Sequence, residues 1–237
     1  MKTQPISHDE ACRNFEKQAG VSFKNRELLQ QAFTHRSYVN ESHAGVREHN
    51  ERLEFLGDAV LELSVTDYLF GAYPAHTEGD LTSFRAALVN AVILGDIAEK
   101  LGMNECLLLS KGESRDTGRA RATILANTFE AVVGALYLDQ GYEAADLFVK
   151  RHVVPHIGEV IEKGAWRDAK SEFQELAQAK YGMTPKYTTL RAEGPDHDKH
   201  FVVSVSVGDV DIAEGEGKSK QEAEQMAAKK ALSAEKK

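Results

Sequence analysis

Cysteine and long apolar runs are what this sequence has least of. Its 237 residues include only two cysteines, Cys12 and Cys106, which lie far apart and form no C-x-x-C pair. This spacing argues against a disulfide framework and against a thiolate zinc site. The longest apolar stretches, such as AVVGALYL at 131–138, are too short to span a bilayer. The N-terminus has no basic start followed by an apolar run, so we expect no signal peptide, no membrane partner and a cytoplasmic location.

Basic residues are also outnumbered. The sequence has 29 Lys and Arg against 37 Asp and Glu, which gives a formal net charge of −8 at pH 7. Taken alone, this balance points away from nucleic acid as a partner. The length fits one large domain or two small ones. A hydrophobic content of 42% with 28% charged residues is ordinary for a soluble globular protein.

What the sequence does contain, over residues 1–158, is helical periodicity. No stretch there alternates convincingly between apolar and polar residues, so we predict an all-α domain. The long expected helices cover 50–70, 78–103 and 124–141. A loop at 110–123, rich in Gly, Lys and Arg, should separate the second of these from the third.

The character of the chain changes after residue 158. We expect a linker at 159–167 and a small α+β domain at 168–237, with the element order α-β-β-β-α. The strand at 200–208 alternates Phe201, Val203, Val205 and Val207 against polar positions, which predicts a half-exposed antiparallel strand. The other expected elements are a helix at 171–182, strands at 187–192 and 210–217, and a last helix that Ser219 and Glu222 open with a capping-box pattern.

An acidic stripe marks the expected helix at 50–70. Glu51, Glu54, Asp58 and Glu62 are spaced three, four and four apart, so all four fall on one narrow helical face. Most of the remaining circumference is apolar. Like charges at these spacings repel, and an unpaired buried carboxylate is costly, so a divalent cation is the simplest compensation. The alternative is a solvated acidic face beside a wide core stripe.

A second polar pair lies on the expected helix at 124–141. Asn127 and Glu130 are three residues apart, beside the small residues Ala131 and Gly134, which would let another helix approach closely. If this face met that of Glu54 and Asp58, four oxygen-donor side chains would converge. Hard oxygen ligands without His or Cys favour Mg²⁺ or Mn²⁺. A helical di-iron site would want Glu-x-x-His pairs, which this chain lacks; ordinary surface positions are the other interpretation of Asn127 and Glu130.

Several ordered segments together resemble one known family. HNERLEFLGDAVLEL at 49–63 closely resembles the signature helix of the ribonuclease III family of double-stranded-RNA endonucleases. The last third of the chain resembles the companion double-stranded-RNA-binding domain, through 168–178 and 217–232. The resemblance covers nearly the whole chain. Other matching segments, in the right order, are FTHRSYVNE, EGDLTSFRAALVN, LLLSKGE and ILANTFEAVVGALYLDQG.

The resemblance implies a metal-dependent active site. Glu54, Asp58 and Glu130 would bind catalytic Mg²⁺, for which Mn²⁺ could substitute, and Asp58 and Glu130 are the expected catalytic residues. The fourth ligand position in the family is usually Asp, but here it is Asn127. An amide oxygen can still be a ligand, but it removes one negative charge and cannot accept a proton. Weaker metal affinity or a shifted metal preference is therefore expected. Glu51 and Glu78 match acidic positions that assist the site less directly.

The implied activity is hydrolysis of phosphodiester bonds in double-stranded RNA. Products would carry 5′-phosphate and 3′-hydroxyl ends with short 3′ overhangs, in the processing of ribosomal, messenger and other structured RNA precursors. Such enzymes are homodimers joined through the signature helix, where Phe55 and Leu56 would lie in the interface or, alternatively, in the core of the monomer. A protein that binds double-stranded RNA without cutting it is the alternative function, because Asn127 departs from the family pattern.

The resemblance also implies RNA contacts in the small domain. Double-stranded RNA is recognised by its shape, its 2′-hydroxyls and its phosphates over about 16 base pairs. Residues 168–237 contain 11 Lys and Arg against 13 Asp and Glu, so binding must come from a local basic patch and should weaken steeply with salt. The implied contact residues are Ser171, Gln174 and Glu175 for one minor groove, His197 for the next, and Lys218 and Lys220 for the phosphates between.

Overall fold

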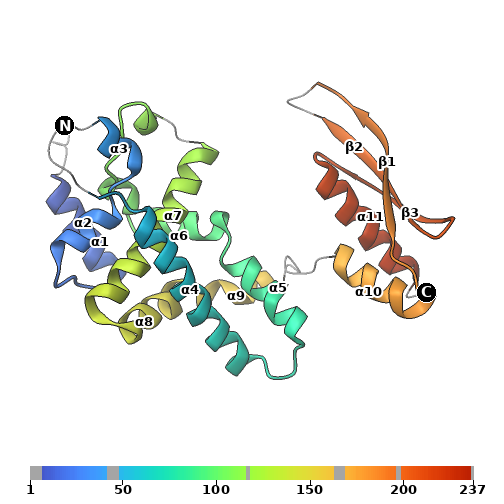
Figure 1. Ribbon diagram of the computed structural model, residues 1–237, viewed down its shortest axis with the longest axis horizontal. Coiled ribbons are helices and arrows are strands. Elements are labelled where there is room, and N and C mark those ends of the chain that lie inside the picture. The colour runs from blue at the N-terminus through green and yellow to red at the C-terminus, as the bar shows by residue number, and fades with distance from the viewer. Residues whose placement is uncertain (1–6, 42–47, 116–117, 163–168, 196–198, 236–237) are drawn as a thin grey trace. The chain divides into compact units, whose positions relative to one another are not determined.

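The computed structural model describes residues 7–41, 48–115, 118–162, 169–195 and 199–235. It divides into two compact units, Met1–Trp166 and Arg167–Lys237. The first unit is helical, and the second combines three strands with two helices (Figure 1). This confirms the predicted fold class, an all-α domain followed by an α-β-β-β-α domain.

Short connections join the helices of the first unit, and side-chain caps fix several of their ends. Thr77 and Asp80 form a reciprocal capping box at the start of α5. The Asn90 side chain accepts hydrogen bonds from the backbone of Val92 and Ile93 and starts α6. The elements are α1 (His8–Ala19), α2 (Arg26–Ala32), α3 (Arg36–Glu41), α4 (Glu51–Ala72), α5 (Glu78–Leu88), α6 (Ala91–Lys100), η1 (Met103–Cys106), η2 (Glu113–Arg115), α7 (Arg119–Gln140), α8 (Tyr142–His152), η3 (Val154–His156) and α9 (Ile157–Glu162).

Two 22-residue helices, α4 and α7, cross at the centre of this unit. Glycines make the close approach possible. A Cβ at Gly57 would overlap the backbone carbonyl of Glu130, and a Cβ at Gly134 would overlap the backbone carbonyl of Leu53. Phe129 of α7, fully buried, stacks on Phe148 of α8 with ring centroids 5.3 Å apart. The crossing is therefore held rigidly, backbone against backbone, and side chains next to the glycines face one another.

Several sequence-based boundaries were wrong. The single helix expected at 78–103 is two helices, because Asn90 caps a new one. Val92, an apolar residue of this segment, is 69% exposed. The expected basic loop ends early: α7 already begins at Arg119, and Arg121 donates hydrogen bonds to the carbonyls of Glu113 and Ser114. The expected linker at 159–167 starts as helix, since α9 runs to Glu162.

The second unit is an antiparallel sheet packed against two helices. Its elements are α10 (Ala169–Tyr181), β1 (Lys186–Glu193), β2 (His200–Val207), β3 (Val210–Gly217) and α11 (Lys220–Glu235), with strand order β1-β2-β3. Phe173 of α10 and the alanines of α11 form the core with Val205 and Val207. Gly215 allows this packing, because a Cβ there would overlap the backbone of Ala223 and Ala227.

The central strand is more buried than its alternating pattern predicted. Val203, Val205 and Val207 are buried as expected, but Val202 and Ser204 on the opposite face are also buried, and Phe201 is only half-buried. β2 lies between two strands, so neighbouring side chains shield both its faces. Ser204, for example, donates a hydrogen bond to Asp211 of β3 at 3.0 Å.

The start of α11 follows the predicted capping pattern with one variation. Ser219 Oγ accepts from the backbone N–H of Glu222 at 3.1 Å, whereas the Glu222 carboxylate accepts from the backbone of Lys218 at 2.8 Å.

No single described helix is long and apolar enough to cross a membrane. The pair α5 and α6, bent by 44°, passes that test only by length and composition, and its inward residues Leu88 and Leu94 belong to the core.

Candidate active site

The crossing of α4 and α7 brings together the side chains that the sequence singled out. Glu54 and Asp58 flank Gly57 on α4, and Asn127 and Glu130 precede Gly134 on α7. Glu54, Asn127 and Glu130 are half-buried, and Asp58 is exposed. The expectation that these two helix faces meet, with small residues at the contact, agrees with the structure. The roles of the four side chains stay predictions.

Glu130 is the most perturbed carboxyl group of this crossing. Burial, followed by the negative charges of Asp58, Glu54 and Glu62, raises the pKa of Glu130 from its ordinary value of 4.5 to about 7. Each of these causes disfavours the ionised form. Glu130 therefore lies in a negative field, none of the described cations forms an ion pair with it, and the field favours its protonated form.

Glu54 experiences the same field more weakly. Burial and the charges of Glu51 and Asp58 raise the pKa of Glu54, whereas a hydrogen bond from Asn127 lowers it. The Asn127 amide thus joins the two helices by donating to the Glu54 carboxylate. An Asp at position 127 would instead add a fourth negative charge, so the asparagine reduces the repulsion within the site.

The acids of the crossing have no cationic partner within the described residues. The ion pairs of the first unit involve other acids. Glu16, for example, pairs with Arg26, and Asp146 pairs with Lys150. No three His, Cys, Asp or Glu side chains of the described chain are grouped closely enough to hold a metal ion as they stand. Glu54, Asp58 and Glu130 are thus electrostatic neighbours rather than a closed ligand shell, as expected for like charges that repel one another.

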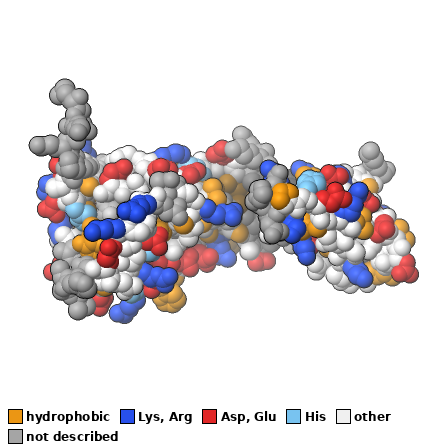
Figure 2. Space-filling model, turned by 90° about the horizontal axis from the view of Figure 1, so that it is seen from above, with side chains coloured by type: hydrophobic (Ala, Val, Ile, Leu, Met, Phe, Trp, Pro, Cys, Tyr) orange, Lys and Arg blue, Asp and Glu red, His pale blue; other side chains and the backbone are white. Residues whose placement is uncertain are grey.

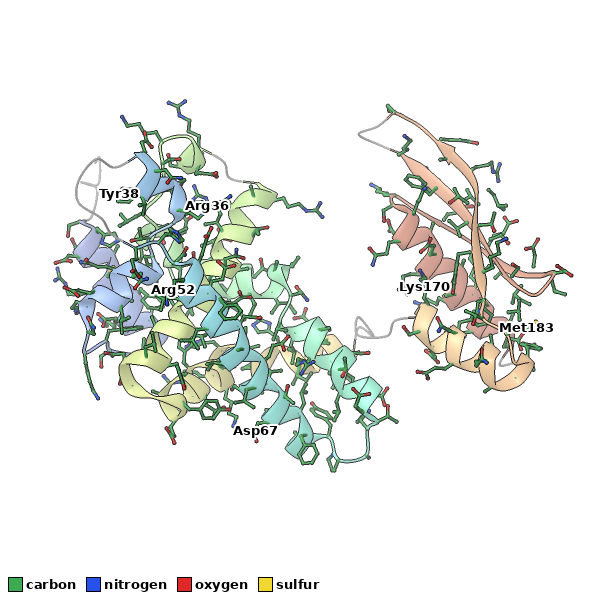
Figure 3. The ribbon with its side chains drawn as sticks, in the orientation of Figure 1. Arg36, Tyr38, Arg52, Asp67, Lys170 and Met183 are labelled. Carbon is green, nitrogen blue, oxygen red and sulfur yellow. The ribbon has the colours of Figure 1, made fainter. Side chains whose placement is uncertain are left out.

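Glu51, expected to assist the site, lies one turn before Glu54 and is exposed. Its carboxylate is 3.3 Å from the Arg36 guanidinium and 3.7 Å from His49 Nδ1. Arg36 of α3 and Arg52 of α4 lie near the N-terminal part of α4 (Figure 3). Glu51 therefore adds negative charge to the site, but it is tied to basic side chains that the inner acids lack.

Glu78 is not brought to the crossing within one chain. It begins α5, and its carboxylate accepts a hydrogen bond from Thr82 at 3.0 Å. It lines a hollow of about 410 Å³ with Thr66 and Phe70 of α4, and Thr66 lies roughly 12 Å beyond Asp58 along the helix axis. An assisting role for Glu78 within the same chain therefore has no support in the structure.

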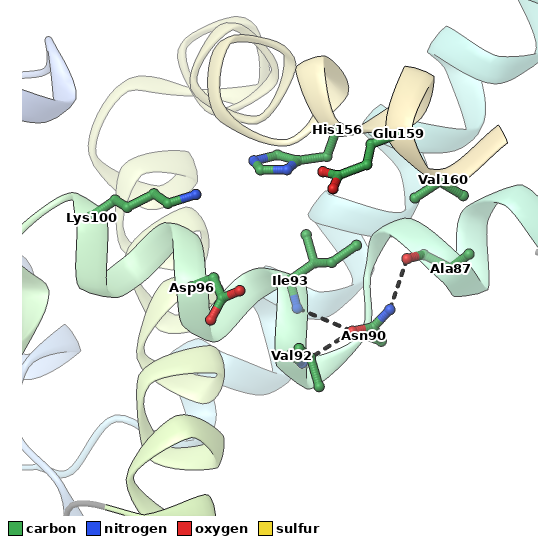
Figure 4. A pocket seen from close by; sticks show the side chains of 9 residues that line it. All are labelled: Ala87, Asn90, Val92, Ile93, Asp96, Lys100, His156, Glu159 and Val160. Carbon is green, nitrogen blue, oxygen red and sulfur yellow. Dashed lines mark hydrogen bonds between the residues drawn. The ribbon is translucent and has the colours of Figure 1, made fainter. Parts of the chain in front are cut away.

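Another hollow in the first unit also lies away from these acids. It has a volume of about 590 Å³ and lies between α6 and the η3–α9 segment, where His156 and Glu159 point toward Ile93 and Asp96 (Figure 4). His152, which lies four residues before His156, is half-buried and hydrogen-bonds to the Ala19 carbonyl at 3.0 Å.

The predicted RNA-contacting residues of the second unit are accessible where the structure describes them. Ser171, Gln174 and Glu175 are exposed on one face of α10, and Lys218 and Lys220 are exposed beside the start of α11. Positive and negative side chains are interspersed over the visible face in Figure 2, so a basic contact surface must be local. His197 lies outside the described residues.

Sequence reasoning missed Gly57. The contact of Gly57 with the Glu130 backbone sets the depth of the crossing, yet a glycine within an otherwise apolar helix gives only a weak signal in a single sequence.

Sequence reasoning also did not decide the position of Phe55. Its side chain is 82% exposed, whereas that of Leu56 is partly buried, so only Phe55 is available to a partner surface.

Comparisons with known proteins agree with the division into a helical unit and a smaller α+β unit. Residues 25–157 match the family model described as Ribonuclease-III-like, and residues 169–234 match the double-stranded RNA binding motif. The chain is 47% identical to the curated Ribonuclease 3 of Pelotomaculum thermopropionicum over 90% of this chain and 88% of that protein. It is also 47% identical to the Ribonuclease 3 of Bacillus cytotoxicus over 98% of this chain and 94% of that protein.

A solved structure is similar to the first unit. The nuclease domain of ribonuclease III from Campylobacter jejuni is 38% identical and has a TM-score of 0.55, over 60% of this chain and 95% of that chain. A helical nuclease domain with oxygen donors at its central crossing, followed by a double-stranded-RNA-binding motif, defines a class of endoribonuclease that acts on RNA duplexes. The chain belongs to the ribonuclease III family.

Proposed function

We propose that the chain is a Mg²⁺-dependent homodimeric endoribonuclease. It hydrolyses phosphodiester bonds of double-stranded RNA to 5′-phosphate and 3′-hydroxyl ends with short 3′ overhangs, and it processes ribosomal, messenger and other structured RNA precursors in the cytoplasm. The observation that carries this proposal is the α4–α7 crossing, where Glu54, Asp58, Asn127 and Glu130 meet without a cationic partner among the described residues.

The donor set of the crossing fits a hard divalent cation. Carboxylate and amide oxygens are the ligands that Mg²⁺ and Mn²⁺ take, and sulfur and imidazole donors are absent from these four positions. When bound, such a cation would supply a water of lowered pKa and stabilisation of the leaving oxygen. Glu54, Asp58 and Glu130 would hold it. Glu130 would have to ionise in order to bind, because its pKa is about 7 without a cation.

The proposed dimer uses the outer face of α4. Phe55, Leu63 and Phe70 lie on one side of this helix and are 82%, 56% and 76% exposed. A row of exposed large apolar side chains on one helix is typical of a protein interface. The Campylobacter jejuni nuclease domain is described as having structural flexibility in a region involved in dimer formation, which supports placing the interface in this unit.

Sedimentation tests the dimer. Phe70→Asp should convert the protein into monomers at micromolar concentration, because it places a charge in an apolar contact. Leu147→Asp is the matched control, since Leu147 is 59% exposed on α8, outside the α4 row. Unchanged dimerisation of Phe70→Asp would remove this face from the interface.

Cleavage and binding assays test the catalytic proposal. With labelled duplex RNA, Glu130→Gln should reduce Mg²⁺-dependent cleavage by more than the roughly 10–100-fold that loss of an outer-shell partner costs, while RNA binding in chelator stays unchanged. Asp96→Asn is the control, because Asp96 is exposed on α6 in the separate hollow. If the unaltered protein binds duplexes but cuts none in Mg²⁺ or Mn²⁺, it is a binding protein only.

Position 127 sharpens the metal proposal. Asn127→Asp adds a negative charge beside Glu54 and Glu130, so the Mg²⁺ concentration needed for half-maximal cleavage should fall. The same substitution should raise the pKa of Glu130 further by repulsion. An unchanged Mg²⁺ dependence would show that the missing charge at position 127 has no effect on the site.

Binding should depend on a few phosphate contacts in the second unit. Lys218→Ala and Lys220→Ala should each reduce the slope of log affinity against log salt by roughly 1. Lys186→Ala, on β1, serves as the control for a change in net charge alone. Equal effects of all three substitutions would contradict a local contact surface at the start of α11.

A further inference from the structure

The two cysteines, far apart in the sequence, meet in the first unit. Cys12 lies in α1, and Cys106 ends η1. Both are free thiols and both are buried, with 4% and 0% of the residue exposed. α1 and η1 pack against each other, and the His8 ring lies against both the Cys12 side chain and the Cys106 backbone carbonyl. The sequence-based argument against a disulfide used their separation along the chain, and folding removes that separation.

His8 completes the cluster, one helical turn before Cys12. Its Nδ1 and Nε2 both lie 3.9 Å from Cys12 Sγ, and Nε2 is 2.9 Å from the backbone carbonyl of Cys106. His8 is half-buried, so it links the buried sulfur atoms to the surface. The Cys106 thiol also lies 3.6 Å from the Gly102 carbonyl, which it can use as a second acceptor.

The two thiols are not equivalent. The hydrogen bond from Cys106, followed by the interactions with His8, lowers the pKa of the Cys12 thiol, although burial opposes this. The pKa of the Cys106 thiol is raised by its hydrogen bond to Cys12 and by burial. These opposite shifts favour the thiolate, which is the reactive form, on Cys12 rather than on Cys106.

We propose that Cys12 and Cys106 are a redox-reactive pair that hydrogen peroxide converts into an intramolecular disulfide, with Cys12 attacking first and Cys106 resolving. The geometry that carries this is the cluster that the two buried cysteines form around the His8 ring, which lies 3.9 Å from Cys12 Sγ and 2.9 Å from the Cys106 carbonyl. His8 is a positioning residue, which orients Cys12 and stabilises its thiolate.

The chemistry balances as a two-electron oxidation. The Cys12 thiolate attacks one peroxide oxygen, the O–O bond breaks, and the departing hydroxide takes up a proton to leave as water. Cys12 is then a sulfenic acid. Cys106 loses its proton and attacks the Cys12 sulfur, so the S–S bond forms while the S–O bond breaks and the second water leaves. Two thiols are oxidised, and one peroxide is reduced to two waters.

The disulfide would fasten α1 to the segment that leads into the nuclease core. Two residues after Cys106, the backbone of Leu108 hydrogen-bonds to the backbone of Phe33 and His35. His8 and Cys12 precede the residues that match the family model, which begin at 25. Closing so long a loop should stabilise the fold and raise the melting temperature by roughly 5–10 °C. In a reducing compartment the pair would rest as free thiols.

Peroxide titration of the reduced full-length protein tests the pair. After alkylation under denaturing conditions, we expect both thiols to be lost together, a mass lower by two hydrogen atoms, and one cross-linked peptide that joins residues 12 and 106. The melting temperature should rise in parallel and return with dithiothreitol. Two alkylated thiols after peroxide, oxidation of Cys12 to a sulfinic acid alone, or disulfide-linked dimers would each overturn the proposal.

Variants separate the roles within the pair. Cys106→Ser should leave a sulfenic acid on Cys12 that dimedone traps, whereas Cys12→Ser should leave Cys106 unreactive. His8→Asn should slow disulfide formation about 10-fold and move the pH profile of the reaction upward, because less thiolate is present at neutral pH. Similar melting temperatures of the reduced variants verify folding. Equal peroxide reactivity of Cys12→Ser and Cys106→Ser would contradict the assigned order.

Discussion

The acidic residues in the two halves of α4 have opposite electrostatic surroundings. In the N-terminal half, Glu54 and Asp58 meet Glu130 of α7, and each added negative charge makes ionisation of Glu130 harder. In the C-terminal half, Asp67 lies 3.1 Å from Lys150 of α8. In Figure 3, Asp67 lies toward the C-terminal end of α4, far from Arg52 at the N-terminal end.

The C-terminal half is a complete polar network. Lys150 also lies 2.9 Å from Asp146, and buried Ser64 donates a hydrogen bond to Asp146 at 2.6 Å. Interaction with these carboxylates raises the pKa of Lys150, the hydrogen bond to Asp146 being the largest cause. Acids that are paired with a cation of the same protein, such as these, stabilise the fold. Acids that gather in a rigid crossing without a cation are instead candidates for an external one.

Adding one methyl group in each half of α4 should give the largest contrast in stability. Gly57→Ala should lower the free energy of unfolding by about 3 kcal/mol and impair cleavage, because its Cβ overlaps the Glu130 carbonyl and must push the helices apart. Gly71→Ala is the matched control in the same helix, since nothing lies within 4 Å of its Cβ position. It should be neutral or stabilising by up to about 1 kcal/mol. Urea denaturation measures both, and equal effects would contradict the close crossing.

The pH dependence of stability should come from the N-terminal half. Glu130 has a pKa of about 7 when folded and 4.5 ordinarily, so the folded state binds its proton more tightly. Stability from this group is fully present below about pH 4.5 and is lost as pH rises through 7. The expected loss is roughly 1–2 kcal/mol once the partial exposure of Glu130 is allowed for. Thermal unfolding across this range should show a slope in the unaltered protein that Glu130→Gln flattens. A slope that persists in that variant would assign it to another group.

Removing the cation of the C-terminal half is expected to have the smallest effect. Lys150→Met removes the ion-pair partner of Asp67 and Asp146, but the Lys150 side chain is about one-third exposed, so the loss should be about 1 kcal/mol. Cleavage and its Mg²⁺ dependence should not change. A parallel loss of cleavage would show that the two halves of α4 are coupled and that our division of them is wrong.

Local sequence patterns predicted much of this structure. The four-residue acidic spacing placed Glu54 and Asp58 on one face, and the small residues around Asn127 and Glu130 indicated which helix would meet them. Caps and turns between elements were less visible. Asn90 divides an apparently continuous apolar period, because a side-chain cap acts locally and does not alter hydrophobic spacing.

Contacts between distant segments were beyond a single sequence. The meeting of Cys12 with Cys106, and the position of Glu78 beside the other end of α4, depend on how the helices pack rather than on any spacing along the chain. Burial on both faces of β2 similarly follows from its central place in the sheet. These features arise from tertiary structure, where a pattern of residues within one element carries no information.

A Mg²⁺ titration followed by calorimetry, at a pH well above the Glu130 pKa, tests the central claim most directly. The unaltered protein should bind Mg²⁺ in the absence of RNA, Glu130→Gln should lose that binding, and Asp67→Asn, in the paired half of α4, should retain it. Equal Mg²⁺ affinity in all three proteins would contradict the assignment of the α4–α7 crossing as the cation site.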